Sequence, residues 1–258
     1  MDKRMDKKVV LQFITITFLI GWTLFGAFYV LRDSPVADIP YMLAGLSPAI
    51  ASYIVLKKNK RVGGLKEWLK NIFNVKARFS SYLLTVFLSA LYIVPSIIIS
   101  GISKVQPFYM FFYFLPLALL AGGLEEPGWR YILQPELDKK FGYIFTSVIV
   151  GIIWALWHLP LYITPEVNQA GRNFGWFAIM VIGGAFALGA IIKVTKNVFL
   201  CMLFHCLINA AGITVVVNET FLGNLIPSLL LIVVSTLIVL IAKEVEKRRL
   251  KIENVSNL

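Results

Sequence analysis

The chain has 258 residues, of which 58% are hydrophobic, and its mean hydropathy is +0.77. A soluble domain of this length does not need so much apolar material, so a soluble fold is excluded. The formal net charge of +11 would suit a nucleic acid, but the charge lies in short connections between apolar runs, so we expect no nucleic-acid partner.

Eight apolar runs follow one another along the chain, and most approach the roughly 20 residues that a helix needs to cross a bilayer. They lack the period-2 alternation of barrel strands, which favours helices. We therefore predict an all-α, polytopic integral membrane protein, with residues 1–258 forming a single transmembrane domain. The predicted spans are Val9–Leu31, Tyr41–Leu56, Ser80–Ile102, Phe108–Leu124, Phe141–Ile163, Phe174–Ile192, Val198–Val217 and Phe221–Ala242.

The basic residues predict how these spans are oriented. All but three of the 25 Lys and Arg residues lie at the N-terminus, in alternate connections or in the C-terminal tail. The three on the other side are Arg32, Lys104 and Arg172. This positive-inside pattern places both termini in the cytoplasm. We expect a bacterial cell membrane, with membrane lipids as the surrounding partner.

Two local features interrupt this pattern of spans. The second span contains Pro48, which predicts a kink because proline lacks a backbone donor and clashes with the preceding turn. The long polar connection after it has apolar residues at helical spacing, which predicts an amphipathic helix near 65–73 in the membrane interface. Those residues are Leu65, Trp68, Leu69, Ile72 and Phe73.

Charged residues enter the apolar part of the chain at Leu119–Leu137, where Glu125, Glu126 and Arg130 follow the fourth run. A carboxylate at membrane depth costs roughly 2.5 to 3.5 kcal/mol on insertion scales, so it is usually functional. Glu126 and Arg130 are four apart and can pair on one helix face, which leaves Glu125 turned toward the bundle. The alternative is that both carboxylates lie at the water interface as a helix-end feature.

The chain has only two histidines, and both lie inside apolar runs. Trp154 lies one turn before His158, and Asn209 lies one turn after His205 on the same helix face. A single histidine in such a helix could be a packing residue. Two histidines, two carboxylates and an asparagine favour a polar site inside the bundle.

These residues resemble the motifs of a known family. Glu125-Glu126-Pro-Gly-Trp-Arg130, Trp154-x-x-x-His158 and His205-x-x-x-Asn209 are similar, in this order, to the motifs of the CPBP family of intramembrane proteases. That family includes the type II CAAX prenyl endopeptidases and the Abi-type bacteriocin-immunity proteins. The resemblance covers a motif core of about 118–212.

The resemblance implies an intramembrane endopeptidase in which Glu125 and His158 activate a water, directly or through a metal. His205 and Asn209 would donate to the oxyanion or complete a metal site, with Glu126 and Arg130 in support. Glu125, His158 and His205 could hold a divalent metal such as zinc, since two His and one Glu match a known zinc ligand set. The substrate would be a membrane-associated peptide or a prenylated or lipidated protein.

The placement of this site gives further expectations. To bring Glu125 and His158 to one depth, we expect the helix after Glu125 to continue beyond Arg130 toward Leu137, and we expect the site to open to the cytoplasm. Two alternatives remain: a non-catalytic bacteriocin-immunity or scaffold membrane protein, and a proton-coupled transporter that uses Glu125 and His158 as a relay.

Overall fold

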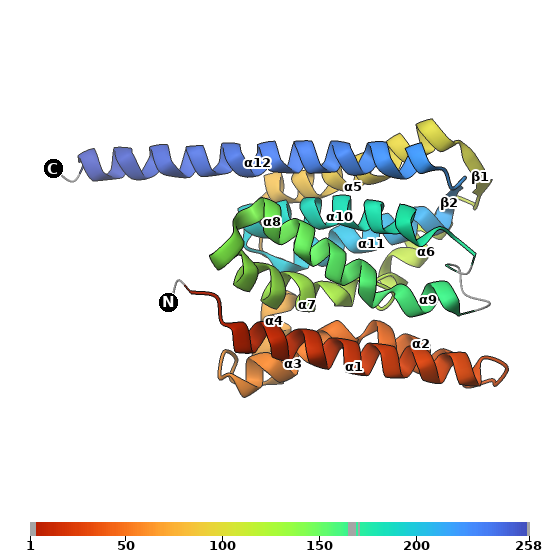
Figure 1. Ribbon diagram of the computed structural model, residues 1–258. Coiled ribbons are helices and arrows are strands. Elements are labelled where there is room, and N and C mark those ends of the chain that lie inside the picture. The colour runs from red at the N-terminus through yellow and green to blue at the C-terminus, as the bar shows by residue number, and fades with distance from the viewer. Residues whose placement is uncertain (1–3, 165–168, 170, 257–258) are drawn as a thin grey trace.

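The computed structural model describes residues 4–164, 169 and 171–256 as a bundle of helices. The long helices run side by side, and the chain begins and finishes at the same end of the bundle (Figure 1). The helices of the first half are α1 (Lys7–Leu31), α2 (Asp38–Gly45), α3 (Ser47–Lys58), α4 (Leu65–Ile72), α5 (Phe79–Ser100) and α6 (Tyr109–Leu117). Those of the second half are α7 (Glu126–Gly128), α8 (Gln134–Trp157), α9 (Leu159–Ile163), α10 (Phe174–Thr195), α11 (Val198–Thr214) and α12 (Phe221–Ser256).

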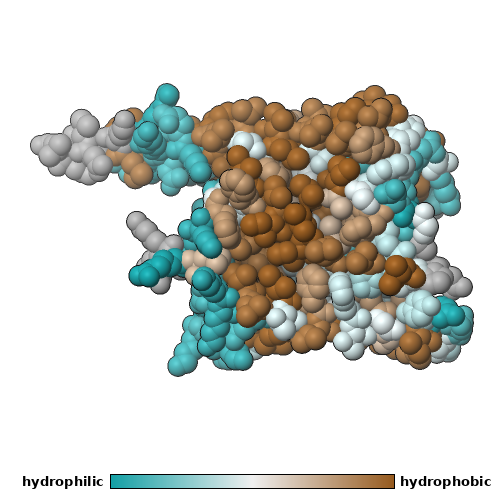
Figure 2. Space-filling view, viewed as in Figure 1, coloured by the Kyte–Doolittle hydropathy of each residue, from teal (hydrophilic) through white to brown (hydrophobic). Residues whose placement is uncertain are grey.

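The predicted all-α membrane class is confirmed, but the count of eight spans is not. Among the described residues, five helical segments are long and apolar enough to cross a membrane, or six if the bent pair α2 and α3 is one span. The other predicted spans fall short because α6 stops at Leu117 and α11 has only 17 residues. A band of apolar side chains covers the visible face of the bundle, and hydrophilic residues gather at its two ends (Figure 2).

The bend between α2 and α3 lies where proline predicts it. The two helices meet at 48°, with Leu46 between them and Pro48 in the first turn of α3. Proline suits a first turn because the missing N–H has no intrahelical partner there. The bend therefore follows from the sequence, and it places the short helix α2 at the end of the bundle away from the termini.

The acidic motif lies on a helical path from Gly123 to Ile163 that is kinked at Gly142, where φ is +70°. A 3₁₀ turn over Gly123–Glu125 leads into α7, and a π-helical stretch over Trp129–Leu133 leads into α8. π-Helical turns are rare and are found mostly at functional sites. The expected continuation of the helix past Arg130 is confirmed.

Helix α10 lies at the centre of the bundle and packs against α8 and α12. Glycines allow both approaches: a Cβ at Gly183 would lie 2.6 Å from Cα of Ser228 on α12, and a Cβ at Gly151 would lie 2.9 Å from Cα of Ile182. Small residues let membrane helices pack closely in this way. Cys201 and Cys206 on α11 are both buried as free thiols.

The predicted amphipathic helix is present as α4, but its apolar residues divide between two environments. Trp68 and Ile72 are buried against the bundle, and Nε1 of Trp68 donates to Oγ of Ser52 at 3.1 Å. Leu65 and Phe73 remain exposed at 51% and 39%. Helix α4 is thus attached to the protein by one part of its apolar side, and the rest faces outward.

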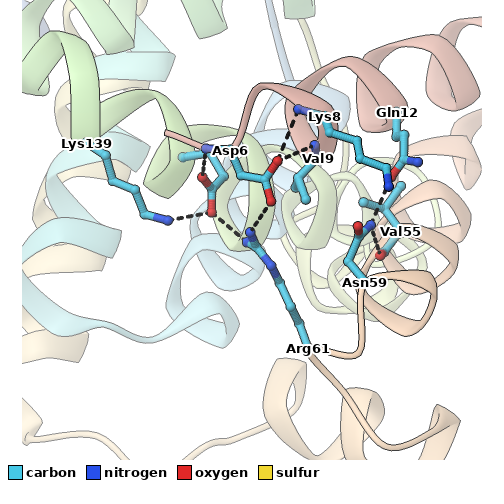
Figure 3. Close-up of polar contacts among 9 residues, drawn as sticks. Asp6, Lys8, Val9, Gln12, Val55, Asn59, Arg61 and Lys139 are labelled. Carbon is cyan, nitrogen blue, oxygen red and sulfur yellow. Dashed lines mark hydrogen bonds and ion pairs between the residues drawn. The ribbon is translucent and has the colours of Figure 1, made fainter. Parts of the chain in front are cut away.

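A cluster of charged groups, named here the rim cluster, joins three segments near the N-terminus (Figure 3). Asp6 accepts the N–H groups of Lys8 and Val9, both at 3.1 Å, and so caps α1. The Val9 N–H lowers the pKa of Asp6 most, and the positive charge of Arg61 lowers it further. Arg61 also donates to Glu136 on α8 at 2.5 Å, and Lys139 donates to the same carboxylate at 2.7 Å.

At the other end of the bundle, two short strands close the connections of α5 and α12. β1 (Ile102–Val105) pairs antiparallel with β2 (Val215–Val217), with Ile102 opposite Val217. This pair ties the C-terminal end of α11 to the connection that precedes α6. It therefore fixes two helices whose residues border the cavity described next.

Candidate active site

The four polar residues singled out in the sequence border one cavity of about 330 Å³. Glu125 comes from the 3₁₀ turn, His158 from the end of α8, and His205 and Asn209 from α11. Most of the remaining wall is aromatic or aliphatic. Those wall residues include Phe25, Tyr41, Met42, Tyr92, Leu117, Leu120, Trp154, Trp157, Phe177 and Ile208. The chain thus builds a small polar group into an otherwise apolar chamber.

Glu125 is buried and is held by two indole groups. Nε1 of Trp154 donates to Oε2 of Glu125 at 2.7 Å, and Nε1 of Trp129 donates to the same oxygen at 3.4 Å. Because both indoles donate to Oε2, Oε1 is the oxygen left for a ligand in the cavity. The indoles therefore fix the carboxylate without neutralising it, and an ionised carboxylate is an acceptor only.

Glu126 is fully buried and lies between Arg130 and His205. Its Oε2 accepts from Nε of Arg130 at 3.0 Å, and its Oε1 accepts from Nδ1 of His205 at 2.8 Å. The predicted pair of Glu126 and Arg130 is present, and the bond to His205 is a contact that the sequence did not indicate. Arg130 continues the network by donating Nη1 to Oε1 of Gln134 at 2.9 Å. Glu126 thus positions His205 instead of facing the cavity.

The two histidines present the same nitrogen to the cavity. Nδ1 of His158 lies 2.9 Å from the carbonyl oxygen of Trp154, which can only accept, so Nδ1 carries the proton. In the neutral ring of His158, Nε2 is then an acceptor. Nδ1 of His205 is occupied by Glu126, so its Nε2 is likewise the free nitrogen.

Gly122 brings the main chain against the second histidine. Its φ of +148° favours glycine, and a Cβ there would lie 2.6 Å from Nε2 of His205. Nδ2 of Asn209 donates to the carbonyl oxygen of Ala121 at 2.7 Å. Asn209 therefore also fastens the segment before the acidic pair, while its side chain borders the cavity.

The three residues predicted to hold a metal, Glu125, His158 and His205, all border the cavity. Within the described ranges, no three His, Cys, Asp or Glu side chains are grouped so that they could hold a metal ion. Nδ1 of each histidine is engaged and both indoles reach Oε2 of Glu125, so Nε2 of each histidine and Oε1 of Glu125 are the atoms that could ligate. A metal held by Glu125, His158 and His205 stays a prediction, and no step below is assigned to one.

Trp154 is the residue that the sequence analysis undervalued. Its indole holds Glu125, its carbonyl oxygen accepts from His158, and its ring lies 5.4 Å from that of His205. It thereby connects the groups from all three elements. Its place one turn before His158 was the available signal, but the contact with Glu125 depends on how two distant segments pack. Trp129 and Gly122 were missed for the same reason.

The fold and the site together define a class: a polytopic helical membrane protein with a Glu, His and Asn site enclosed in its bundle. Residues 106–211 match the family described as type II CAAX prenyl endopeptidase, Rce1-like. CAAX prenyl protease 2 of Methanococcus maripaludis is 30% identical over 192 residues, which cover 65% of this chain and 69% of that protein. The chain therefore belongs to the family of CAAX-type intramembrane proteases.

A second relative shows how far the likeness extends. Lysostaphin resistance protein A of Staphylococcus haemolyticus is 29% identical to this chain over 124 residues. The match covers 47% of this chain but only 31% of that protein. It supports common ancestry of the membrane core, and most of that relative lies outside the match.

Proposed function

We propose that the protein is an intramembrane endopeptidase that hydrolyses a peptide bond with a water activated by Glu125 and His158. The observation that supports this most strongly is that Glu125, His158, His205 and Asn209 border one cavity. A non-catalytic scaffold does not need these groups to meet in one chamber. The arrangement also suits hydrolysis more than proton transfer across the membrane, because the groups gather at one place.

The first step of this mechanism is removal of a proton from water. The water oxygen attacks the carbonyl carbon of the peptide bond while its proton passes to Glu125 or to Nε2 of His158. A positioned base contributes typically 10²- to 10⁴-fold to such a step. The two indole donors hold Glu125 in place, and the Trp154 carbonyl fixes the tautomer of His158 that has a free acceptor.

His205 and Asn209 stabilise the negatively charged oxygen that forms in this attack. Nε2 of His205 and Nδ2 of Asn209 are the donors on the opposite helix, α11. Donation from Nε2 requires the imidazolium form, because Nδ1 already donates to Glu126, and that carboxylate stabilises the positive ring. The carbon–nitrogen bond then breaks, and the proton taken from water passes to the leaving amine. Loss of one oxyanion donor typically costs about 10²- to 10³-fold in rate.

The cavity walls indicate what the substrate looks like. At about 330 Å³ the space holds on the order of ten waters at ~30 Å³ each, enough for a short peptide segment and the attacking water. Its aromatic and aliphatic lining suits an apolar or lipidated peptide. The related protein from Methanococcus maripaludis is called a CAAX prenyl protease, and we propose a prenylated or otherwise membrane-associated peptide here as well.

The test is cleavage of a quenched fluorescent, farnesylated CAAX peptide by the purified protein in detergent micelles. We expect Glu125→Gln to lower kcat/KM by at least about 100-fold. The control is Glu67→Gln, which changes a carboxylate on α4 that accepts from Gly63 and lies away from the cavity. An unchanged rate for Glu125→Gln would contradict the mechanism. The same peptide without the farnesyl group measures what the lipid contributes.

A further inference from the structure

The cavity does not lie midway along the bundle. On α1 it is bordered by Phe25, which is about 27 Å from the start of the helix at Lys7 but only about 9 Å from its end at Leu31, at 1.5 Å per residue. On α11, Asn209 is about 17 Å from Val198 and about 8 Å from Thr214. Both helices start at the end of the bundle where the chain terminates (Figure 1).

Most of the other wall residues lie in the same half, and His205 lies near the middle of α11. His158 and Trp157 are at the C-terminal end of α8, and Phe177 is in the first turn of α10. These ends, together with α2 and α9, lie opposite the two termini in Figure 1. Gln169, from the connection between α9 and α10, also borders the cavity. The cavity is therefore nearest to the face of the bundle that lies away from both termini.

The charge distribution assigns a side of the membrane to that face. The termini end of the bundle holds the basic N-terminus, the connection from α3 to α5 and the basic tail of α12. The opposite end holds only Arg32, Lys104 and Arg172 among the basic residues. Short connections rich in Lys and Arg stay in the cytoplasm. The end that is poor in basic residues then lies on the non-cytoplasmic side.

We infer that the catalytic cavity opens on the non-cytoplasmic side, and that its substrate is a membrane-anchored peptide presented from that side. The nature of the substrate rests on the proposed function. The side of the membrane rests on the position of the cavity and on the distribution of basic residues. It replaces the expectation from the sequence that the site opens to the cytoplasm, because hydropathy does not report where a cavity lies along the helices. A peptide confined to the cytoplasm would have to cross most of the bundle to reach Glu125.

The substrate side can be tested without knowing the substrate. Cells that contain the wild-type protein are compared with cells that contain Glu125→Gln, and newly formed peptide ends are identified in the membrane fraction and the medium. We expect the ends that depend on Glu125 to map to segments on the non-cytoplasmic side. Ends that map to cytoplasmic segments would overturn the inference, and identical sets of ends would count against the proposed protease activity.

The orientation is tested independently of activity by labelling with a membrane-impermeant maleimide. Three variants are used: Lys104→Cys on β1, Met42→Cys on the cavity wall, where the side chain is 53% exposed, and Lys66→Cys on α4. The wild type is the control, because both native cysteines are buried. We expect Lys104→Cys and Met42→Cys to be labelled in intact cells, and Lys66→Cys only after permeabilisation. Labelling of Lys66→Cys in intact cells, or protection of Met42→Cys there, would overturn the inference.

Discussion

Two buried carboxylates on the same helical path, Glu126 and Glu136, each join three parts of the fold, but in different surroundings. Glu126 is paired with Arg130, which is fully buried, and with His205. Glu136 is paired with Arg61 and Lys139, whose side chains are 33% and 32% exposed. Water can thus reach the cations of the rim cluster, whereas the Arg130 side chain beside Glu126 is completely enclosed by protein.

The comparison shows that similar ion pairs have different roles when their cations are differently buried. Removing one partner of a buried pair leaves an uncompensated charge and costs about 3–5 kcal/mol, whereas an exposed pair contributes about 0–1 kcal/mol. The rim cluster therefore connects α1, α8 and the segment that follows α3. Loss of one of its ion pairs should cost little stability. The Glu126 network is costly to break. Its bond to Nδ1 of His205 orients that ring, which gives a reason for placing the network in the bundle.

The largest expected effect is that of Glu126→Gln. The change keeps the shape of the side chain but leaves Arg130 buried without its counter-charge, so we expect the melting temperature in detergent to fall by about 10 °C, along with loss of peptide cleavage. The matched change Glu136→Gln should lower the melting temperature by only about 3 °C and leave cleavage unchanged. Equal losses of stability would show that the burial of the cations does not decide how much each network contributes.

Gly122→Ala comes next, because a Cβ there would lie 2.6 Å from Nε2 of His205. We expect cleavage to fall by about 100-fold as His205 is displaced, since small misplacements of catalytic groups can cost that much. The control is Gly142→Ala, also at a positive φ of +70°, where no neighbouring atom lies within 4 Å of the added Cβ. That variant should lose about 1–2 kcal/mol of stability and keep its cleavage rate. Equal activity of the two variants would contradict the tight approach at Gly122.

A smaller effect is expected for Trp154→Phe, which keeps an aromatic ring but removes the donor to Oε2 of Glu125. We expect kcat to fall by about 10-fold with little change in KM, because the charged acceptor loses a hydrogen bond of about 1.5–3 kcal/mol. Trp68→Phe is the matched control, since its indole donates to Oγ of Ser52 and does not border the cavity. A change confined to KM would mean that Trp154 only shapes the wall.

The smallest effect belongs to the rim cluster and depends on pH. The folded protein lowers the pKa of Asp6 below its ordinary value of 3.8, so the ionised carboxylate adds stability above that value. This contribution is lost as the pH falls through the pKa of the folded state. Asp6→Asn retains a capping oxygen, so its melting temperature should be slightly below that of the wild type above about pH 5, and the difference should vanish only below the lowered pKa of the folded state. A difference that grows toward low pH would contradict this assignment.

Much of the candidate site could be predicted because its residues are chemically out of place in an apolar sequence. Glu125, His158, His205 and Asn209 stand out against Leu, Ile and Phe, and the structure brings them to one cavity. The contacts of Trp154 and the bond from His205 to Glu126 could not be found in this way. Both depend on how segments far apart in sequence pack. The spacing of residues along the chain does not indicate which group an indole or a second carboxylate will contact.

The number of spans was predicted less well than the site. Hydropathy treats Phe108–Leu124 as one run, but Pro116 lies near the end of α6 and the chain then turns at Gly122 before the helix restarts at Gly123. The break predicted after Asp138, Lys139 and Lys140 is present as a kink at Gly142, where the backbone is not helical. Average hydropathy does not detect where backbone geometry ends a helix within an apolar run.

The central claim, that Glu125 and His158 activate one water in one cavity, is tested most directly by a double-mutant cycle. The rates of farnesylated-peptide cleavage are measured for the wild type, Glu125→Gln, His158→Ala and the double variant. If the two residues act as one unit, the double variant should be no more than about threefold slower than the slower single variant. Losses that multiply, or single variants that retain the wild-type rate, would contradict the claim.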